Sequence, residues 1–160
     1  MSEDYLNKLK KRNENNTKSV SYNCGGYALR TYSWYLPYED EDELNQEVAS
    51  YNYDEDELAE ELTDRCVDKI IEDFDGAITI AFSDTSYDPA QYELIAFRVS
   101  VDEYIFYESN DWDFHFKVLR DGRWMEKNGS ESIHECDEDD WDGPGYFYNG
   151  DTVYLLHKIA

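Results

Sequence analysis

The sequence has little positive charge. Among its 160 residues, 14 are Lys or Arg and 38 are Asp or Glu, which gives a net charge of −24. A surface with this charge repels nucleic acid and anionic membranes at long range, so we expect neither as a direct partner. The charge suits either a highly soluble protein or a surface that binds a basic protein by imitating the phosphates of nucleic acid.

Long apolar runs are absent and cysteines are few. No run approaches the roughly 20 apolar residues that cross a bilayer. The first residues, MSEDYLNKLKKRNENN, lack the apolar stretch of a signal peptide. Cys24, Cys66 and Cys136 are odd in number and far apart, which favours reduced thiols over a disulfide framework. We therefore expect a cytoplasmic protein.

Aromatic residues, in contrast, are plentiful. The chain has 15 Tyr, 7 Phe and 4 Trp, a content that disordered chains do not have. Its length suits one domain with a substantial core. We divide it into a polar N-terminal arm or short helix over residues 1–20 and a single domain over residues 21–160. No internal repeat is visible.

Apolar residues at helical spacing predict two helices. The first covers residues 24–36 and ends before Pro37. The second covers residues 55–74 and lies in the strongly acidic segment 39–75, which we interpret as an acidic helical insertion. Cys66 falls on the apolar side of the second helix, so we expect it to be a core thiol.

After the second helix the apolar period changes to two, which predicts strands. The pair Asp121-Gly122 predicts a hairpin with a tight primed turn. Helices followed by an antiparallel sheet define the α+β class. The expected strands cover residues 77–83, 92–100, 103–109, 113–120, 123–127 and 152–159.

Cys24 is the candidate nucleophile. It stands at the expected start of the first helix, where the macrodipole and free backbone N–H groups stabilise a thiolate and a developing oxyanion. Gly25 and Gly26 are expected to let a substrate backbone approach closely. Asn23 or Tyr22 is expected to supply a further contact to the oxyanion or the substrate.

His115, on the first strand of the predicted hairpin, is the candidate base. An imidazole base needs an acceptor that orients it, and the second strand offers Glu126, with Asn128 as the alternative. A surface histidine without a catalytic role is the competing interpretation. A Cys nucleophile, a His base and an orienting acceptor define acyl transfer, which includes hydrolysis of a peptide or amide bond and deamidation.

Two segments, YNCGGYAL and DWDFHFKVLRDGRWMEKNGS, occur in this order and resemble papain-like cysteine hydrolases. The resemblance is to the NlpC-type and CHAP-type branch and to related uncharacterised bacterial and phage proteins. It implies helices packed on an antiparallel sheet, Cys24 as nucleophile, His115 as base and Glu126 in the third position. It implies a peptide or amide substrate, which includes proteins. The hairpin motif of the family matches Trp124, Lys127 and Gly129.

Metal and cofactor motifs are weak. Residues 138–143 match the opening of an EF-hand loop, but Asn149 stands at the closing position and Pro144 interrupts the loop. His134 and Cys136 form one potential metal-binding pair without a second. There is no Walker loop and no dinucleotide fingerprint. We expect no metal and no cofactor.

The alternative function is a non-catalytic, strongly acidic binding protein. Such a protein, which a phage could encode, would block a basic surface of a host defence protein, because a fold can persist after its chemistry is lost. This hypothesis assigns partner binding to an acidic face made of Glu39, Asp40, Glu41, Asp42, Glu43, Asp54, Glu55, Asp56 and Glu57.

Overall fold

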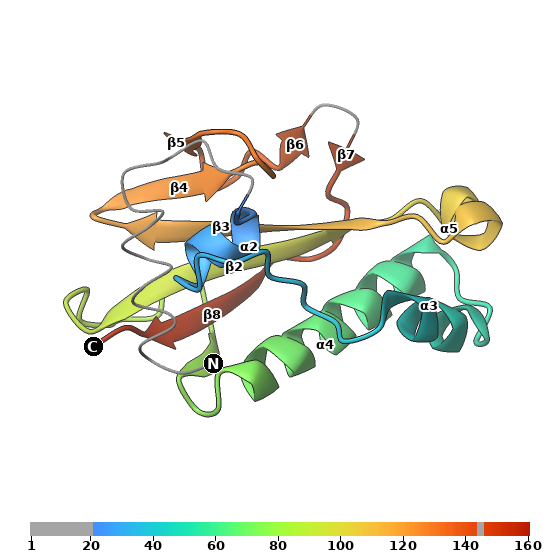
Figure 1. Ribbon diagram of the computed structural model, residues 1–160, viewed down its shortest axis with the longest axis horizontal. Coiled ribbons are helices and arrows are strands. Elements are labelled where there is room, and N and C mark those ends of the chain that lie inside the picture. The colour runs from blue at the N-terminus through green and yellow to red at the C-terminus, as the bar shows by residue number, and fades with distance from the viewer. Residues whose placement is uncertain (1–20, 144–145) are drawn as a thin grey trace.

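The chain folds as an α+β protein around a six-stranded antiparallel sheet, which confirms the predicted class (Figure 1). The structure is a computed structural model that describes residues 21–143 and 146–160. The predicted N-terminal arm, residues 1–20, lies outside the described residues. No helix in the described part of the chain is both long enough and apolar enough to span a membrane.

The sheet has the strand order β1-β8-β2-β3-β4-β5, with all neighbours antiparallel. β6 and β7 form a separate two-stranded ribbon. The bounds are β1 (Ile78–Ala81), β2 (Tyr92–Ser100), β3 (Asp113–Arg120), β4 (Arg123–Lys127), β5 (Ile133–Glu135), β6 (Asp142–Gly143), β7 (Tyr146–Phe147) and β8 (Val153–Lys158).

β3 and β4 form the predicted hairpin. Asp121 and Gly122 both have positive φ values, 55° and 75°, as a primed two-residue turn requires. Arg120 pairs with Arg123 across the turn. The hairpin therefore puts alternate residues of β3 and β4 on a common face of the sheet, which is the arrangement that the predicted site needs.

Four helices are described: α2 (Cys24–Ala28), α3 (Glu41–Ala49), α4 (Glu55–Asp73) and α5 (Glu103–Ser109). Figure 1 shows α2 and α4 in front of the sheet; α2 contacts β3 and β4, whereas α4 contacts β1 and β2. α4 is the predicted second helix. Its buried face includes Cys66, which is a core thiol as expected. Its N-terminus has a capping box between Asp54 and Glu57.

Two sequence predictions are wrong. Residues 103–109, expected as a strand, form α5, because Asp102 caps the helix and only Phe106 is buried. An alternating aromatic run of seven residues fits one side of a short helix as well as a strand. The first helix ends at Ala28 instead of residue 36, because the backbone turns into the left-handed region at Arg30, with φ 59°.

A buried ion cluster ties the end of α2 to the sheet. Arg30 and Arg120 each contact both carboxylate oxygens of Glu93 on β2, at 2.7 to 2.9 Å. Arg120 also donates to the carbonyl oxygens of Tyr27 and Ala28. Burial raises the pKa of Glu93, but the hydrogen bonds and charges of the two guanidiniums outweigh it and lower the pKa to about 2.

We predict that Glu93→Gln destabilises the fold by about 3 kcal/mol at neutral pH, because both guanidiniums lose a buried partner charge. Chemical denaturation measures the difference. Because the folded pKa is about 2, below the ordinary 4.5, the contribution is present above pH 4.5 and is lost towards pH 2, so the difference from wild type narrows in that window. The control, Glu60→Gln, changes an exposed carboxylate of α4 and leaves stability unchanged. An equal effect of both variants would contradict the prediction.

Candidate active site

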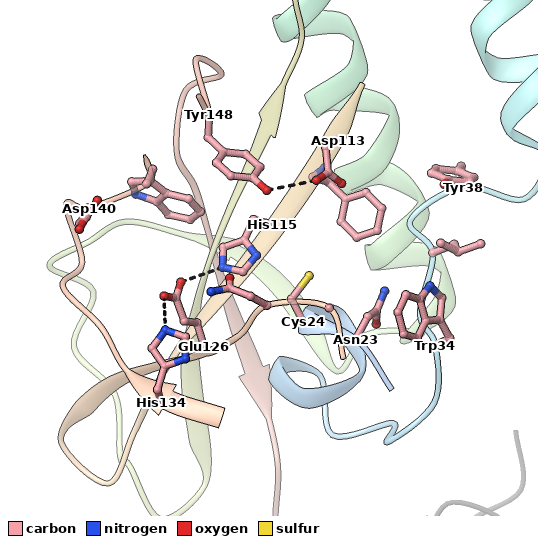
Figure 2. Close-up of a pocket in the computed structure, with 15 residues that line it drawn as sticks. Asn23, Cys24, Trp34, Tyr38, Asp113, His115, Glu126, His134, Asp140 and Tyr148 are labelled. Carbon is pink, nitrogen blue, oxygen red and sulfur yellow. Dashed lines mark hydrogen bonds and ion pairs between the residues drawn. The ribbon is translucent and has the colours of Figure 1, made fainter. Parts of the chain in front are cut away.

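The fold brings Cys24, His115 and Glu126 together from three elements. His115 on β3 shares a hydrogen bond between its Nε2 and Glu126 Oε1 on β4, at 2.8 Å. The Cys24 thiol, at the first position of α2, lies close enough to the same imidazole to raise its pKa. Figure 2 shows the sulfur on the side of the ring that faces away from Glu126. The imidazole therefore lies between a thiol and a carboxylate.

Asn23 sets the position of Cys24. Its side-chain oxygen accepts hydrogen bonds from the backbone N–H groups of Gly26 and Tyr35, both at 3.0 Å. Its side-chain nitrogen donates to the Tyr35 carbonyl at 2.8 Å. Asn23 thus caps α2 and joins it to the following loop. The Asn23 amide therefore bonds to the protein backbone, and through these bonds it positions the Cys24 thiol.

The site favours a protonated His115. Burial opposes the charged imidazole, but the hydrogen bonds and charges of Cys24 and Glu126 outweigh burial and raise the pKa of His115 to about 9. Burial likewise raises the pKa of Glu126, but His115 and His134 lower it more. Both groups therefore prefer their charged forms at neutral pH, as an imidazolium beside a carboxylate.

A second histidine supports Glu126, and the sequence interpretation missed this role. His134 on β5 shares a hydrogen bond between its Nε2 and Glu126 Oε2, at 2.8 Å. β4 and β5 pair so that Glu126 lies opposite His134. The signal in the sequence was Asn128-Gly129, a dipeptide typical of turns between strands, which predicts that residues after it return along β4. Among the described residues, no three His, Cys, Asp or Glu side chains are grouped so that they could bind a metal ion.

Two aromatic side chains, those of Trp141 and Tyr148, pack against the His115 ring. The Trp141 ring meets the imidazole edge-on with centroids 6.0 Å apart, and the Tyr148 ring lies 5.6 Å away. Lys117, fully buried on β3, donates to the carbonyl oxygens of Asp137 and Asp140 and lies 4.4 Å from the Trp141 ring. These contacts hold Trp141 and Tyr148 against the histidine at the edge of the pocket described below.

Lys127 lies beneath the start of α2. Its ammonium group is fully buried, donates to the carbonyl oxygens of Tyr22 and Gly129, and lies 4.7 Å from the Tyr22 ring. Burial lowers the pKa of Lys127, while the neighbouring Cys24 and Glu131 favour the charged form. Lys127 thus connects the residues before Cys24 to the end of the hairpin.

Tyr22, Gly25 and Gly26 are buried and do not line the pocket. A Cβ atom on Gly26 would lie 1.9 Å from the carbonyl oxygen of Ser33, and one on Gly25 would lie 3.1 Å from the Phe116 ring. The glycines therefore allow close packing of α2 inside the protein. These contacts give no support to the role in substrate approach that we expected for Gly25 and Gly26. The carbonyl of Tyr22, expected near the substrate, instead accepts a hydrogen bond from Lys127.

Cys24 opens into a pocket of about 680 Å³. The pocket also contains Asn128, the alternative third residue, but the hydrogen bond to His115 comes from Glu126. Of the other two thiols, Cys66 has no exposed surface and burial raises its pKa, and burial raises the pKa of Cys136 to about 12.

The acidic face consists of the N-terminal ends of α3 and α4. Asp40 caps α3 and Asp54 caps α4, and the acidic residues that follow lie in the first turns, where the helix macrodipole favours negative charge. Most of these side chains are exposed. Helix capping thus accounts for the position of these residues without a partner.

Comparisons of the chain with protein-family models, curated proteins and solved structures find no match.

We predict that the imidazolium of His115 deprotonates with a pKa near 9. Glu126→Gln should lower this pKa, because the glutamine removes a negative charge beside the imidazolium. Since the pKa is raised, the ring stays protonated through neutral pH and deprotonates as the pH rises through about 9. NMR titration of the ring protons measures both values. Glu135→Gln, which removes an exposed carboxylate on β5, is the matched control. A wild-type pKa near 6.5, or one that Glu126→Gln leaves unchanged, would contradict the assignment.

Proposed function

We propose that this protein is a papain-like cysteine hydrolase that acts on a peptide or amide bond. The observation that carries the proposal is one imidazole, that of His115, placed between the Cys24 thiol and the Glu126 carboxylate beside an open pocket. A nucleophile, a base and an orienting acceptor placed close together are the parts that acyl transfer requires. The helix-borne Cys followed by a sheet-borne His also agrees with the NlpC-type and CHAP-type resemblance of the sequence.

The reaction begins from a thiolate and an imidazolium. The Cys24 sulfur attacks the carbonyl carbon, a C–S bond forms, and the carbonyl oxygen takes the electron pair as an oxyanion. When the oxyanion collapses, the C–N bond breaks and His115 gives its proton to the leaving amine. Neutral His115 then takes a proton from water, whose oxygen attacks the thioester. The acid is released and the thiolate–imidazolium pair returns.

The surrounding residues bind the oxyanion, orient His115 and position Cys24. The backbone N–H of Cys24, in the first turn of α2, is the proposed oxyanion donor, since first-turn amides have no intrahelical acceptor. Glu126 orients His115 and stabilises its charge. His134 and Asn23 are positioning residues, because they act through Glu126 and Cys24. The Trp141 ring packs edge-on against the imidazole and helps to fix its orientation.

We predict that iodoacetamide modifies Cys24 faster than Cys136 or Cys66 at neutral pH. Cys24 lines the pocket and contacts an imidazole, whereas burial raises the pKa of both other thiols. Peptide mapping by mass spectrometry gives the three rates. His115→Ala should slow labelling of Cys24 at least about tenfold, because the thiolate loses its counter-charge.

Glu126→Gln should slow Cys24 labelling less than His115→Ala, since the amide oxygen still orients the ring. Glu135→Gln is the control and should change nothing. Equal and slow labelling of Cys24 and Cys66 in the native protein, or a His115→Ala variant that labels as fast as wild type, would remove the case for a nucleophile.

The alternative proposal is an acidic binding protein without catalysis. The net charge of −24 and the exposed acidic face support it, although helix capping explains part of that charge. It predicts a basic protein partner whose association weakens steeply with salt, because exposed charges are screened over about 10 Å at 0.1 M ionic strength. Charge reversal at Glu39, Glu41 and Asp56 would then abolish the biological effect, while Cys24→Ala would retain it. The hydrolase proposal expects the opposite result for both variants.

A further inference from the structure

The pocket beside Cys24 has an exposed apolar wall. Trp34 and Leu36, in the loop that follows α2, line the pocket with 50% and 41% of their surface exposed. Tyr38 continues the same wall, and Figure 2 places Trp34 and Tyr38 on the side of Cys24 away from Glu126. Large apolar side chains exposed at a pocket mark a binding surface. Because the three side chains follow one another along a single loop, an extended peptide could bind along them.

The end of the pocket near Tyr38 contains a carboxylate among aromatic rings. Asp113, the first residue of β3, accepts a hydrogen bond from the Tyr148 hydroxyl at 3.2 Å and one from the backbone N–H of Phe114 at 2.8 Å. The Tyr38 ring packs edge-on against Phe114, 6.2 Å between centroids. Figure 2 shows the Asp113 carboxylate between Tyr148 and Tyr38 in this view.

Among the described residues, no Lys or Arg lines this pocket, and the cationic His115 is already paired with Glu126, whereas Asp113 and Asp140 add two further carboxylates. The nearby lysines do not compensate, because Lys117 and Lys127 are fully buried and donate to backbone carbonyls. At the Asp113 end of the pocket, an acidic side chain, or the free carboxylate of a chain end, would therefore meet like charge and negatively polarised ring faces. A cation instead gains from both the carboxylate and the rings.

We propose that the substrate is a basic polypeptide, bound with a Lys or Arg side chain against Asp113 and with its backbone along the wall of Trp34 and Leu36. The inference deepens the proposed hydrolase function and rests on it. The net charge of −24 acts in the same direction, since a strongly anionic surface attracts a basic chain from a distance. Asp113 then selects the side chain beside the bond that Cys24 attacks.

Three chloromethyl ketones of similar size test the proposal: those of N-acetyl-lysine, N-acetyl-norleucine and N-acetyl-glutamate. Each alkylates an active-site thiol, and norleucine differs from lysine in lacking the charge. The measurement is the rate of Cys24 alkylation in the full-length protein at 1 M salt, where long-range attraction is screened to about 3 Å. We expect the lysine reagent to react about tenfold faster than the norleucine reagent, and the glutamate reagent to react slowest.

Asp113→Asn should reduce the lysine-to-norleucine ratio to about one, because it removes the charge and keeps a hydrogen-bond acceptor for Tyr148. Asp111→Asn is the matched control: it removes the same charge from an exposed position two residues away, outside the pocket, and leaves the ratio unchanged. Thermal unfolding shows that each variant is folded.

The outcomes separate this inference from the proposed function. If all three reagents alkylate Cys24 equally fast, and His115→Ala slows all of them, the hydrolase proposal stands and cation recognition is wrong. Equal loss of the ratio in Asp113→Asn and Asp111→Asn would also overturn a role for Asp113. If no reagent alkylates Cys24 faster than Cys136, both proposals fail together.

Discussion

The docking of a five-residue helix onto the β3–β4 hairpin is the contact on which the site depends. A helix as short as α2 is unstable alone, since its few hydrogen bonds do not compensate for nucleation. Asn23 holds its first turn, and Arg120, fixed by Glu93, donates to its last carbonyl groups. Gly26 allows the loop at Ser33 to pass directly against it. Cys24 meets His115 because both ends of this helix are tied to the rest of the fold.

The positive charges near Cys24 determine the chemistry that the site can support. In a protein of net charge −24, two buried positive groups lie near the candidate nucleophile: His115, whose pKa is raised by Cys24, and Lys127, which lies under the start of α2. Backbone carbonyls satisfy Lys117 and Lys127, which makes their burial tolerable. Unlike the two lysines, His115 faces an acceptor, the pocket and the Cys24 thiol, so it is the group proposed to transfer a proton.

The sequence predicted those features that depend on local chemistry. Asp121-Gly122 defined the hairpin, the apolar stripe defined α4, and the register of β3 and β4 made Glu126 a candidate acceptor for His115. Features that depend on tertiary contacts were missed or wrong. α2 ends just before Arg30, whose backbone is left-handed and whose side chain pairs with Glu93 far along the chain, and no local pattern encodes that pairing. The helix α5 and the partnership of His134 with Glu126 depend on burial and on strand pairing.

The most direct measurement is the reaction of the protein with 4-nitrophenyl acetate, followed by absorbance and by mass spectrometry of peptides. If Cys24 is a nucleophile assisted by His115, each chain releases a rapid burst of about one nitrophenolate. The acetyl group is then found on Cys24 and is lost slowly as water attacks the thioester. The Cys24→Ala variant should show no burst. A wild-type burst no larger than that of Cys24→Ala, or acetyl groups found only on lysines, would contradict the central claim.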